Sequence, residues 1–245
     1  MNYKESTWCG FRRLDFEFEG YPAILILPDT PHEKGRIALK TEYFDAFPAT
    51  EIEMLKAGYH VAYLKNRSRW GTDDDCDRKK HFIDFLADEF GTSRRAIPVG
   101  MSCGGLHAVA FASRYPEAIS FLYLDAPLLS FFSIAPRLRQ DHVIPTRWPE
   151  IKKAWGFKTY AEAYAYADQP IHRIGTLIEH RLPVGLVYGL IDEQVPPYEN
   201  AEILAELYAA ADAPIKVWAR PCYGHHPHGL TDPKELLHYI EEVAL

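Results

Sequence analysis

The sequence lacks the features that mark nucleic-acid-binding and membrane-spanning proteins. Its formal net charge is −7, and no cluster of Lys and Arg with interleaved aromatic residues offers a surface for nucleic acid. No apolar run is long enough to cross a bilayer, and charged residues interrupt the N-terminal stretch where a signal peptide needs an apolar segment. We therefore expect no nucleic-acid partner, no membrane span and a cytoplasmic location.

Cysteine is also scarce. The four cysteines are far apart and show no CxxC spacing: Cys9, Cys76, Cys103 and Cys222. This pattern is typical of reduced thiols and argues against a zinc site or a disulfide framework. Internal repeats and low-complexity tracts are absent as well. A chain of 245 residues, 47% of them hydrophobic, can bury a large core, so we expect one domain over residues 1–245.

The sequence does contain a regular alternation of strand and helix patterns. Residues 12–20 alternate apolar and polar, and residues 21–28 form an apolar run, which together predict an antiparallel edge of a sheet. Further strands are predicted at 35–41, 59–65, 96–100, 121–127, 181–189 and 213–219. Helical patterns follow most of these strands. Such alternation predicts an α/β fold with a mostly parallel central sheet and helices on both faces.

One segment, at about residues 129–180, breaks this alternation. It follows a strand and is rich in aromatic residues, among them Phe131 and Trp148. Its position predicts a helical lid, and these two aromatic residues are candidates for substrate contact. The alternative is that the aromatic residues pack into a small core of the insertion itself.

The most informative motif is GMSCGG at residues 100–105. It stands between a short apolar strand pattern and a small-residue helix pattern, so Ser102 is predicted to lie at a sharp strand-to-helix turn. Glycine on both sides leaves room for the strained backbone of such a turn. The free N–H groups at the start of the helix then favour a developing negative charge. This context predicts that Ser102 is a nucleophile.

A serine nucleophile needs a histidine to take its proton and a carboxylate to orient that histidine. Asp192 and His225 each follow a predicted strand, and their order after Ser102 is the order that this elbow motif predicts. Glu193 and Asp125 remain alternatives for the acid.

His226 and His228 remain alternatives for the base. Three histidines within four positions also invite a metal interpretation, but no carboxylate or cysteine stands at recognised zinc spacing. We therefore predict no metal and no cofactor.

The oxyanion that forms during acyl transfer needs two N–H donors. The residue after the nucleophile, Cys103, supplies the first donor through its backbone. The second is expected in the segment KTEYFDAFP, residues 40–48, just beyond a predicted strand.

Taken in order, GMSCGG, YGLIDEQVPP and YGHHPHGLTDP resemble the α/β-hydrolase fold superfamily, and the resemblance covers nearly the whole chain. The segment TEYFDAF is similar to a loop of dienelactone-hydrolase-like members. That resemblance implies that the backbone N–H of Tyr43 is the second oxyanion donor and that Glu42 faces the site. Those enzymes have cysteine where this chain has Ser102, which favours ester cleavage over lactone chemistry. The GHHPHGL loop and the insertion resemble bacterial esterases and prolyl-oligopeptidase-like hydrolases, including some that act on acylated carbohydrates.

The sequence therefore predicts a serine esterase that acts on a small-molecule ester. A small-peptide hydrolase and a non-catalytic binding protein on the same fold are the alternatives. Arg67, Arg69 and Trp70 follow a predicted strand near the same edge, where they either contact an acidic or sugar-like group or belong to a solvated loop. Self-association into a homo-oligomer is compatible with the sequence.

Overall fold

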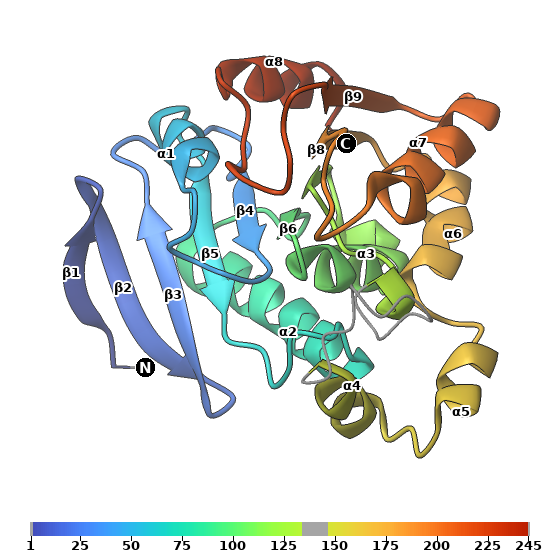
Figure 1. Cartoon of the computed structure of the whole chain (residues 1–245). Helices are drawn as coiled ribbons and strands as arrows, with labels where there is room; N and C mark the ends of the chain where they lie inside the picture. The colour runs from blue at the N-terminus through green and yellow to red at the C-terminus, as the bar shows by residue number, and fades with distance from the viewer. Residues whose placement is uncertain (1, 134–146, 245) are drawn as a thin grey trace.

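A mixed sheet forms the centre of the protein (Figure 1). The computed structural model describes residues 2–133 and 147–244. In spatial order, the nine described strands are β1 (Lys4–Trp8), β2 (Phe11–Phe18), β3 (Tyr21–Leu27), β5 (His60–Leu64), β4 (Ile37–Lys40), β6 (Ile97–Met101), β7 (Leu122–Asp125), β8 (Val184–Gly189) and β9 (Ile215–Arg220). The first four in this order pair antiparallel, and all pairs from β5 to β9 are parallel. The predicted antiparallel edge and parallel centre are confirmed.

The outermost strand, β1, was not expected from the sequence. Four of its five residues are exposed, so it shows no alternation of apolar and polar positions. It exists because it pairs with β2, from Lys4 opposite Asp15 to Trp8 opposite Phe11. Long-range pairing of this kind is invisible in a local hydrophobic pattern.

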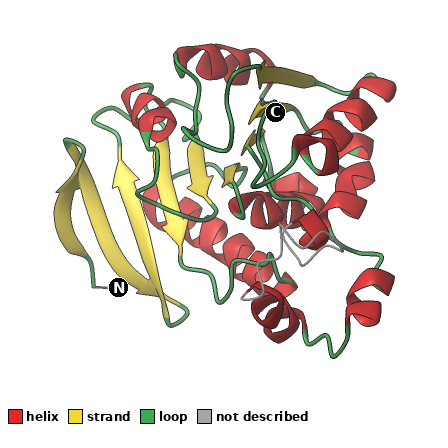
Figure 2. Cartoon of the chain, viewed as in Figure 1, coloured by secondary structure: helices red, strands yellow, loops and turns green. Residues whose placement is uncertain are grey.

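Helices cover both faces of the sheet (Figure 2). The described α-helices are α1 (Ala49–Lys56), α2 (Asp73–Phe90), α3 (Gly104–Arg114), α4 (Arg147–Trp155), α5 (Tyr160–Ala165), α6 (Ile174–Glu179), α7 (Ala201–Ala210) and α8 (Lys234–Val243). Buried side chains of α1 and α8 form one core with the sheet, and those of α2, α3, α6 and α7 form a second core. This two-layer covering explains why the central strands are buried on both sides.

The parallel strands bring distant loops to one edge. The loops after β4, β6, β8 and β9 carry residues 40–48, the GMSCGG turn, Asp192 and the three neighbouring histidines, and all follow the carboxyl ends of their strands. In a parallel sheet these ends lie on the same side. The fold therefore gathers the predicted site at one sheet edge.

The predicted insertion at 129–180 is built from short helices, and its residues 134–146 lie outside the described part of the chain. Its described aromatic residues pack largely on one another. The Phe131 and Trp155 rings are 5.4 Å apart, and Trp148 stacks on Tyr160 at 4.0 Å. The insertion is tied to the main domain where the Trp155 indole N–H donates to the Trp70 carbonyl at 3.1 Å. A lid role for this segment remains a prediction.

Among the described residues, none of the helices has both the length and the apolar character required to cross a membrane.

Candidate active site

Ser102 lies at the turn between β6 and α3 in a strained backbone conformation. Its φ is +52°, in the left-handed region that non-glycine residues rarely adopt. The neighbouring glycines are required by packing. A Cβ on Gly105 would lie 2.6 Å from the Pro127 Cβ, and one on Gly100 would lie 2.7 Å from the Ala108 Cβ. The glycines let α3 approach the sheet, and the strained turn presents Ser102 at its edge.

The structure joins Ser102, His225 and Asp192 in one line of hydrogen bonds. Nε2 of His225 lies 3.0 Å from Oγ of Ser102, and Nδ1 of His225 lies 2.7 Å from Oδ2 of Asp192. A carboxylate at Nδ1 fixes the proton on that nitrogen and leaves Nε2 able to accept one. The arrangement can therefore move the hydroxyl proton of Ser102 to His225.

Asp192 is itself held in place. Its other oxygen, Oδ1, accepts the backbone N–H groups of Gln194 and Val195, both at 2.9 Å. The side chain is only 1% exposed, so Oδ2 is directed at His225 in a site shielded from water. The alternative acid Glu193 is exposed to solvent.

Asp125, the other alternative acid, binds a different histidine. Its Oδ1 lies 2.9 Å from Nδ1 of His228, and its Oδ2 accepts the Gly229 N–H at 2.5 Å and the Tyr123 hydroxyl at 3.1 Å. This second His–Asp pair was not predicted from the sequence. A signal was present, because an aspartate at the carboxyl end of a central strand faces the same sheet edge.

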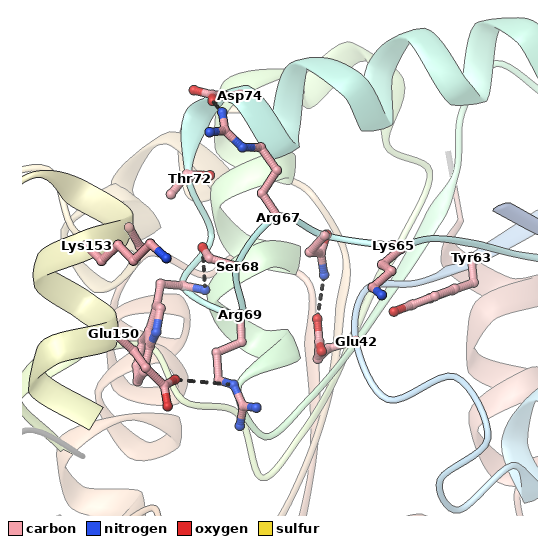
Figure 3. Close-up of a pocket in the computed structure, with 13 residues that line it drawn as sticks. Glu42, Tyr63, Lys65, Arg67, Ser68, Arg69, Thr72, Asp74, Glu150 and Lys153 are labelled. Atoms are coloured by element: carbon pink, nitrogen blue, oxygen red, sulfur yellow. Dashed lines mark hydrogen bonds and ion pairs between the residues drawn. The ribbon is translucent and has the colours of Figure 1, made fainter. Parts of the chain in front are cut away.

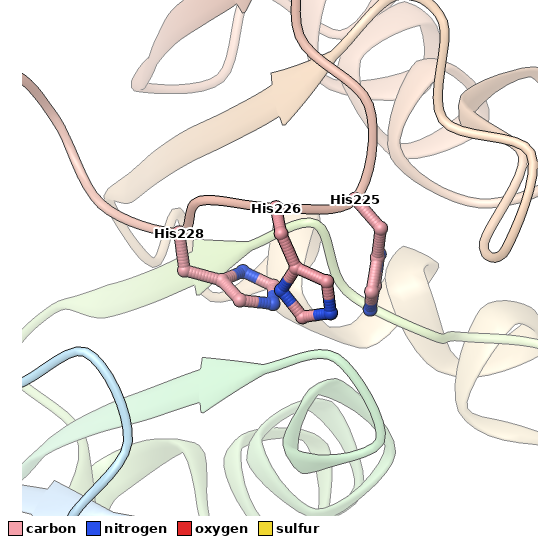
Figure 4. A group of neighbouring side chains, drawn as sticks. All are labelled: His225, His226 and His228. Carbon is pink, nitrogen blue, oxygen red and sulfur yellow. The ribbon is translucent and has the colours of Figure 1, made fainter.

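Three histidine rings gather beneath the loop between β9 and α8 (Figure 4). One ligand nitrogen from each of His225, His226 and His228 can be chosen so that all three lie within 4.8 Å of one another. His225 and His228 are buried, whereas His226 is exposed. Among the residues that the structure describes, these three histidines form the group that could hold a metal ion.

Cys103 and Tyr43, the predicted oxyanion donors, are neighbours. Within the described part of the chain, neither backbone N–H has a hydrogen-bond acceptor. The Tyr43 hydroxyl is within hydrogen-bonding reach of the Cys103 thiol, and burial is the main reason that the pKa of each side chain is raised. Tyr43 also has a positive φ of +55°. Two unpaired N–H groups on adjacent loops are what an anion site requires.

A polar cavity of about 510 Å³ lies beside these loops (Figure 3). Glu42, Arg69 and Trp70 line it together with Glu150 and Lys153 from α4. Charged groups in the lining carry both signs, and the Arg69 Nε lies 3.7 Å from a Glu150 carboxylate oxygen.

The other two predicted substrate contacts do not line this cavity. Phe131 is fully buried, and Trp148 is 8% exposed and covered by Tyr160. Both belong to a buried cluster that the insertion shares with the main domain, where Trp70, Cys103 and Leu106 contribute to it.

Burial raises the pKa of Glu42, and the Asn66 amide opposes the shift by donating to its Oε2 at 2.5 Å. Asn66 is also part of a network of hydrogen-bonded polar side chains that extends away from the cavity. Its Oδ1 accepts from the Lys79 ammonium, which lies 3.4 Å from Nδ1 of His107. His107 Nε2 is 2.8 Å from the carbonyl of Ser68 in the cavity wall. This network fixes the cavity wall. No sequence pattern indicated it, because its members are scattered along the chain.

No family model and no curated protein matches the chain, but solved structures do. The acetyl xylan esterase 1 of Thermoanaerobacterium sp. is 17% identical with a TM-score of 0.60, and the match covers 99% of this chain and 87% of that one. The acylaminoacyl peptidase of Pyrococcus horikoshii is 12% identical with a TM-score of 0.69, covering 100% and 42%. A dipeptidyl-aminopeptidase-IV-like protein of Bacteroides ovatus is 15% identical with a TM-score of 0.70, covering 99% and 36%.

The chain thus spans only about a third to two fifths of the two peptidase-type proteins, and most of the esterase. At these identities the similarity concerns the fold. Together with the sheet order, the two helical layers and the serine turn after β6, it leads to one conclusion: the chain has the α/β-hydrolase fold.

Proposed function

We propose that the protein is a serine hydrolase that cleaves a small carboxylic ester through an acyl-enzyme. The Ser102 hydroxyl attacks the ester carbonyl while His225 accepts its proton. His225 returns that proton to the departing alcohol, and Asp192 stabilises the imidazolium that exists between the two steps. Water, activated by His225 in the same way, then releases the acid and restores Ser102.

The single observation that carries this proposal is the hydrogen-bonded line from Ser102 through His225 to Asp192. Its distances of 3.0 and 2.7 Å lie within the range required for proton transfer between nucleophile, base and orienting acid. The tetrahedral oxyanion is held by the backbone N–H groups of Cys103 and Tyr43, which have no other acceptor among the described residues.

A polar, small-molecule ester is the substrate class that the cavity favours. Ser102, His225 and Asp192 do not line this cavity; its link to the proposed reaction is Glu42, the residue before the proposed oxyanion donor Tyr43. Most of the lining residues are charged or polar, so a leaving group that extends into the cavity is sugar-like or acidic rather than a long acyl chain. The name of the acetyl xylan esterase denotes an acylated carbohydrate as the substrate of that enzyme, which agrees with this class. We infer a lid role for α4 of the 129–180 segment, which is supported by Glu150 and Lys153 on one side of the cavity.

Labelling with a fluorophosphonate probe and hydrolysis of an aryl acetate test the proposal. We expect the probe to modify Ser102, and we expect Ser102→Ala to lower turnover by several orders of magnitude without lowering the melting temperature. Ser113→Ala is the matched control, because Ser113 lies in the last turn of α3, the helix that follows Ser102. We expect this variant to retain activity. Near-parental hydrolysis by Ser102→Ala would refute the assignment.

The same assays separate the two alternative functions. Preferred hydrolysis of an aminoacyl anilide identifies a small-peptide hydrolase, the class suggested by the two peptidase-type structures. Absence of both labelling and hydrolysis identifies a non-catalytic binding protein.

The four cysteines are unpaired, which supports the predicted cytoplasmic location.

A further inference from the structure

The buried side chain of His228 has a nitrogen that the proposed reaction does not use. Its Nδ1 is bound to Asp125, and the side chain is only 2% exposed, yet its Nε2 has no hydrogen-bond partner among the described residues. An unsatisfied buried imidazole nitrogen is costly and calls for an explanation.

His225 and His228 share one arrangement. In each ring Nδ1 faces a buried carboxylate, Asp192 for the first and Asp125 for the second. A carboxylate on one nitrogen of a histidine holds the proton there and leaves the lone pair of the other nitrogen available, which is the usual support of a metal-binding histidine. The sequence argued against a metal because no carboxylate stands near these histidines in the chain. The fold brings two carboxylates to them from elsewhere in the chain, Asp125 at the end of β7 and Asp192 after β8.

The spacing of the three rings fits a zinc-type ion. The centroid distances are 4.9 Å between His225 and His226, 4.8 Å between His225 and His228, and 5.0 Å between His226 and His228. With Zn–N bonds of about 2.0–2.1 Å, three tetrahedrally placed imidazoles would have centroids about 5.2 Å apart. The ring centroids therefore need little change, but the ligand nitrogens, which lie within 4.8 Å of one another, must turn inward to the separation of about 3.3 Å that tetrahedral zinc requires.

The loop that carries the rings is already fixed. The Arg220 guanidinium donates to the carbonyls of Pro227 at 2.9 Å and Gly229 at 2.8 Å. Phe47 covers the outer ring, stacked on His226 at 5.5 Å with an interplanar angle of 14°. A site held before the ion arrives loses little conformational freedom on binding.

We propose that His225, His226 and His228 form an inhibitory site for a zinc-type divalent cation. The ion takes the Nε2 lone pairs of His225 and His228 and one nitrogen of His226, and water or the Ser102 hydroxyl completes four-coordination. With Nε2 occupied, His225 cannot accept the proton of Ser102. The inhibitory consequence rests on the proposed function, whereas the binding site does not.

Calorimetric titration of the chelator-treated full chain with ZnCl₂ tests the site without any activity assay. We expect one ion per chain, with affinity at least about tenfold weaker in His226→Ala. His180→Ala, which removes an exposed histidine at the end of α6, is the matched control and leaves the affinity unchanged. Binding of Co²⁺ with the absorption spectrum of a four-coordinate ion provides a second readout.

Equal zinc affinity in His226→Ala and the parent, or no binding at all, would overturn the site. A second arm measures aryl acetate hydrolysis with added Zn²⁺, each variant relative to its own metal-free rate. Inhibition that a chelator reverses supports the proposal, and zinc binding without inhibition overturns its regulatory part. If the protein hydrolyses no ester, the calorimetry still decides the site, so failure of the two proposals can be told apart.

Discussion

The carboxylate of Asp125 binds His228, 103 residues further along the chain, and so leaves His225 to Asp192. Asp125 ends β7 and Asp192 follows β8, two neighbouring strands in the parallel part of the sheet, and both aspartates are buried. The two pairs have the same chemistry, but only the His225 ring reaches Ser102. Their roles in the proposed reaction should therefore differ sharply.

Asp192→Asn should reduce kcat for ester hydrolysis by about 10⁴-fold, because an amide in place of the carboxylate favours the wrong tautomer of His225. Asp125→Asn makes the same change at the neighbouring pair and should cost far less activity. Turnover of an aryl acetate by the two variants checks this difference. An equal loss in both would mean that the pairs act as one unit.

Cys103 acts through its backbone N–H in the proposed mechanism. Cys103→Ala should then change kcat by less than about threefold, whereas removal of a true oxyanion donor costs about 10²–10³-fold. Steady-state kinetics on the aryl acetate provides the measurement. A loss of a hundredfold or more would assign the buried thiol itself a part in the reaction.

The close approach of α3 to the loop after β7 predicts a penalty at Gly105. An added Cβ would lie 2.6 Å from the Pro127 Cβ and 2.9 Å from the Leu128 carbonyl oxygen. Gly105→Ala should lower the free energy of unfolding by about 1–3 kcal/mol, the usual cost of overpacking. Chemical denaturation measures the change.

Gly175, in helix α6, is the matched control because an added Cβ there has no neighbour within 4 Å. Gly175→Ala should leave stability unchanged or raise it by up to about 1 kcal/mol through helix propensity. A similar loss in both variants would show that packing against Pro127 is not the cause.

The stability of the protein should fall between pH 6.5 and pH 3 because of His107. Burial, reinforced by the nearby Lys79 ammonium, lowers the pKa of His107 from 6.5 to about 3. In this range the unfolded chain binds a proton at this residue and the folded chain does not, so acid favours unfolding by about 1.4 kcal/mol per pH unit at most. The stability that neutral His107 contributes to the folded state is therefore fully present above pH 6.5 and is lost as the pH falls.

Urea unfolding at pH 7.5 and pH 5 checks this expectation. The loss of stability between the two pH values should be smaller in His107→Gln than in the parent, whereas His180→Ala should behave as the parent does. An unchanged loss in His107→Gln would mean that other groups cause the acid sensitivity.

The sequence alone determined most of the elements, though not β1, and the order of the site residues. Alternation of apolar residues predicted the β2–β3 hairpin and the parallel strands, because side-chain burial in a strand follows a period of two or a continuous apolar run. The glycines around Ser102 predicted a sharp turn, since only small residues allow that backbone and that helix packing. Local chemistry of this kind is encoded within a few neighbouring residues.

The tertiary structure decided which side chains meet. Whether Asp192 or Asp125 orients His225, and which histidine reaches Ser102, depends on how loops after β6, β7, β8 and β9 converge. The unsatisfied nitrogen of His228 and the buried chain behind Glu42 arise the same way. Such contacts join residues far apart in the sequence, so no local pattern contains them; only the register and packing of the sheet bring them within hydrogen-bonding distance.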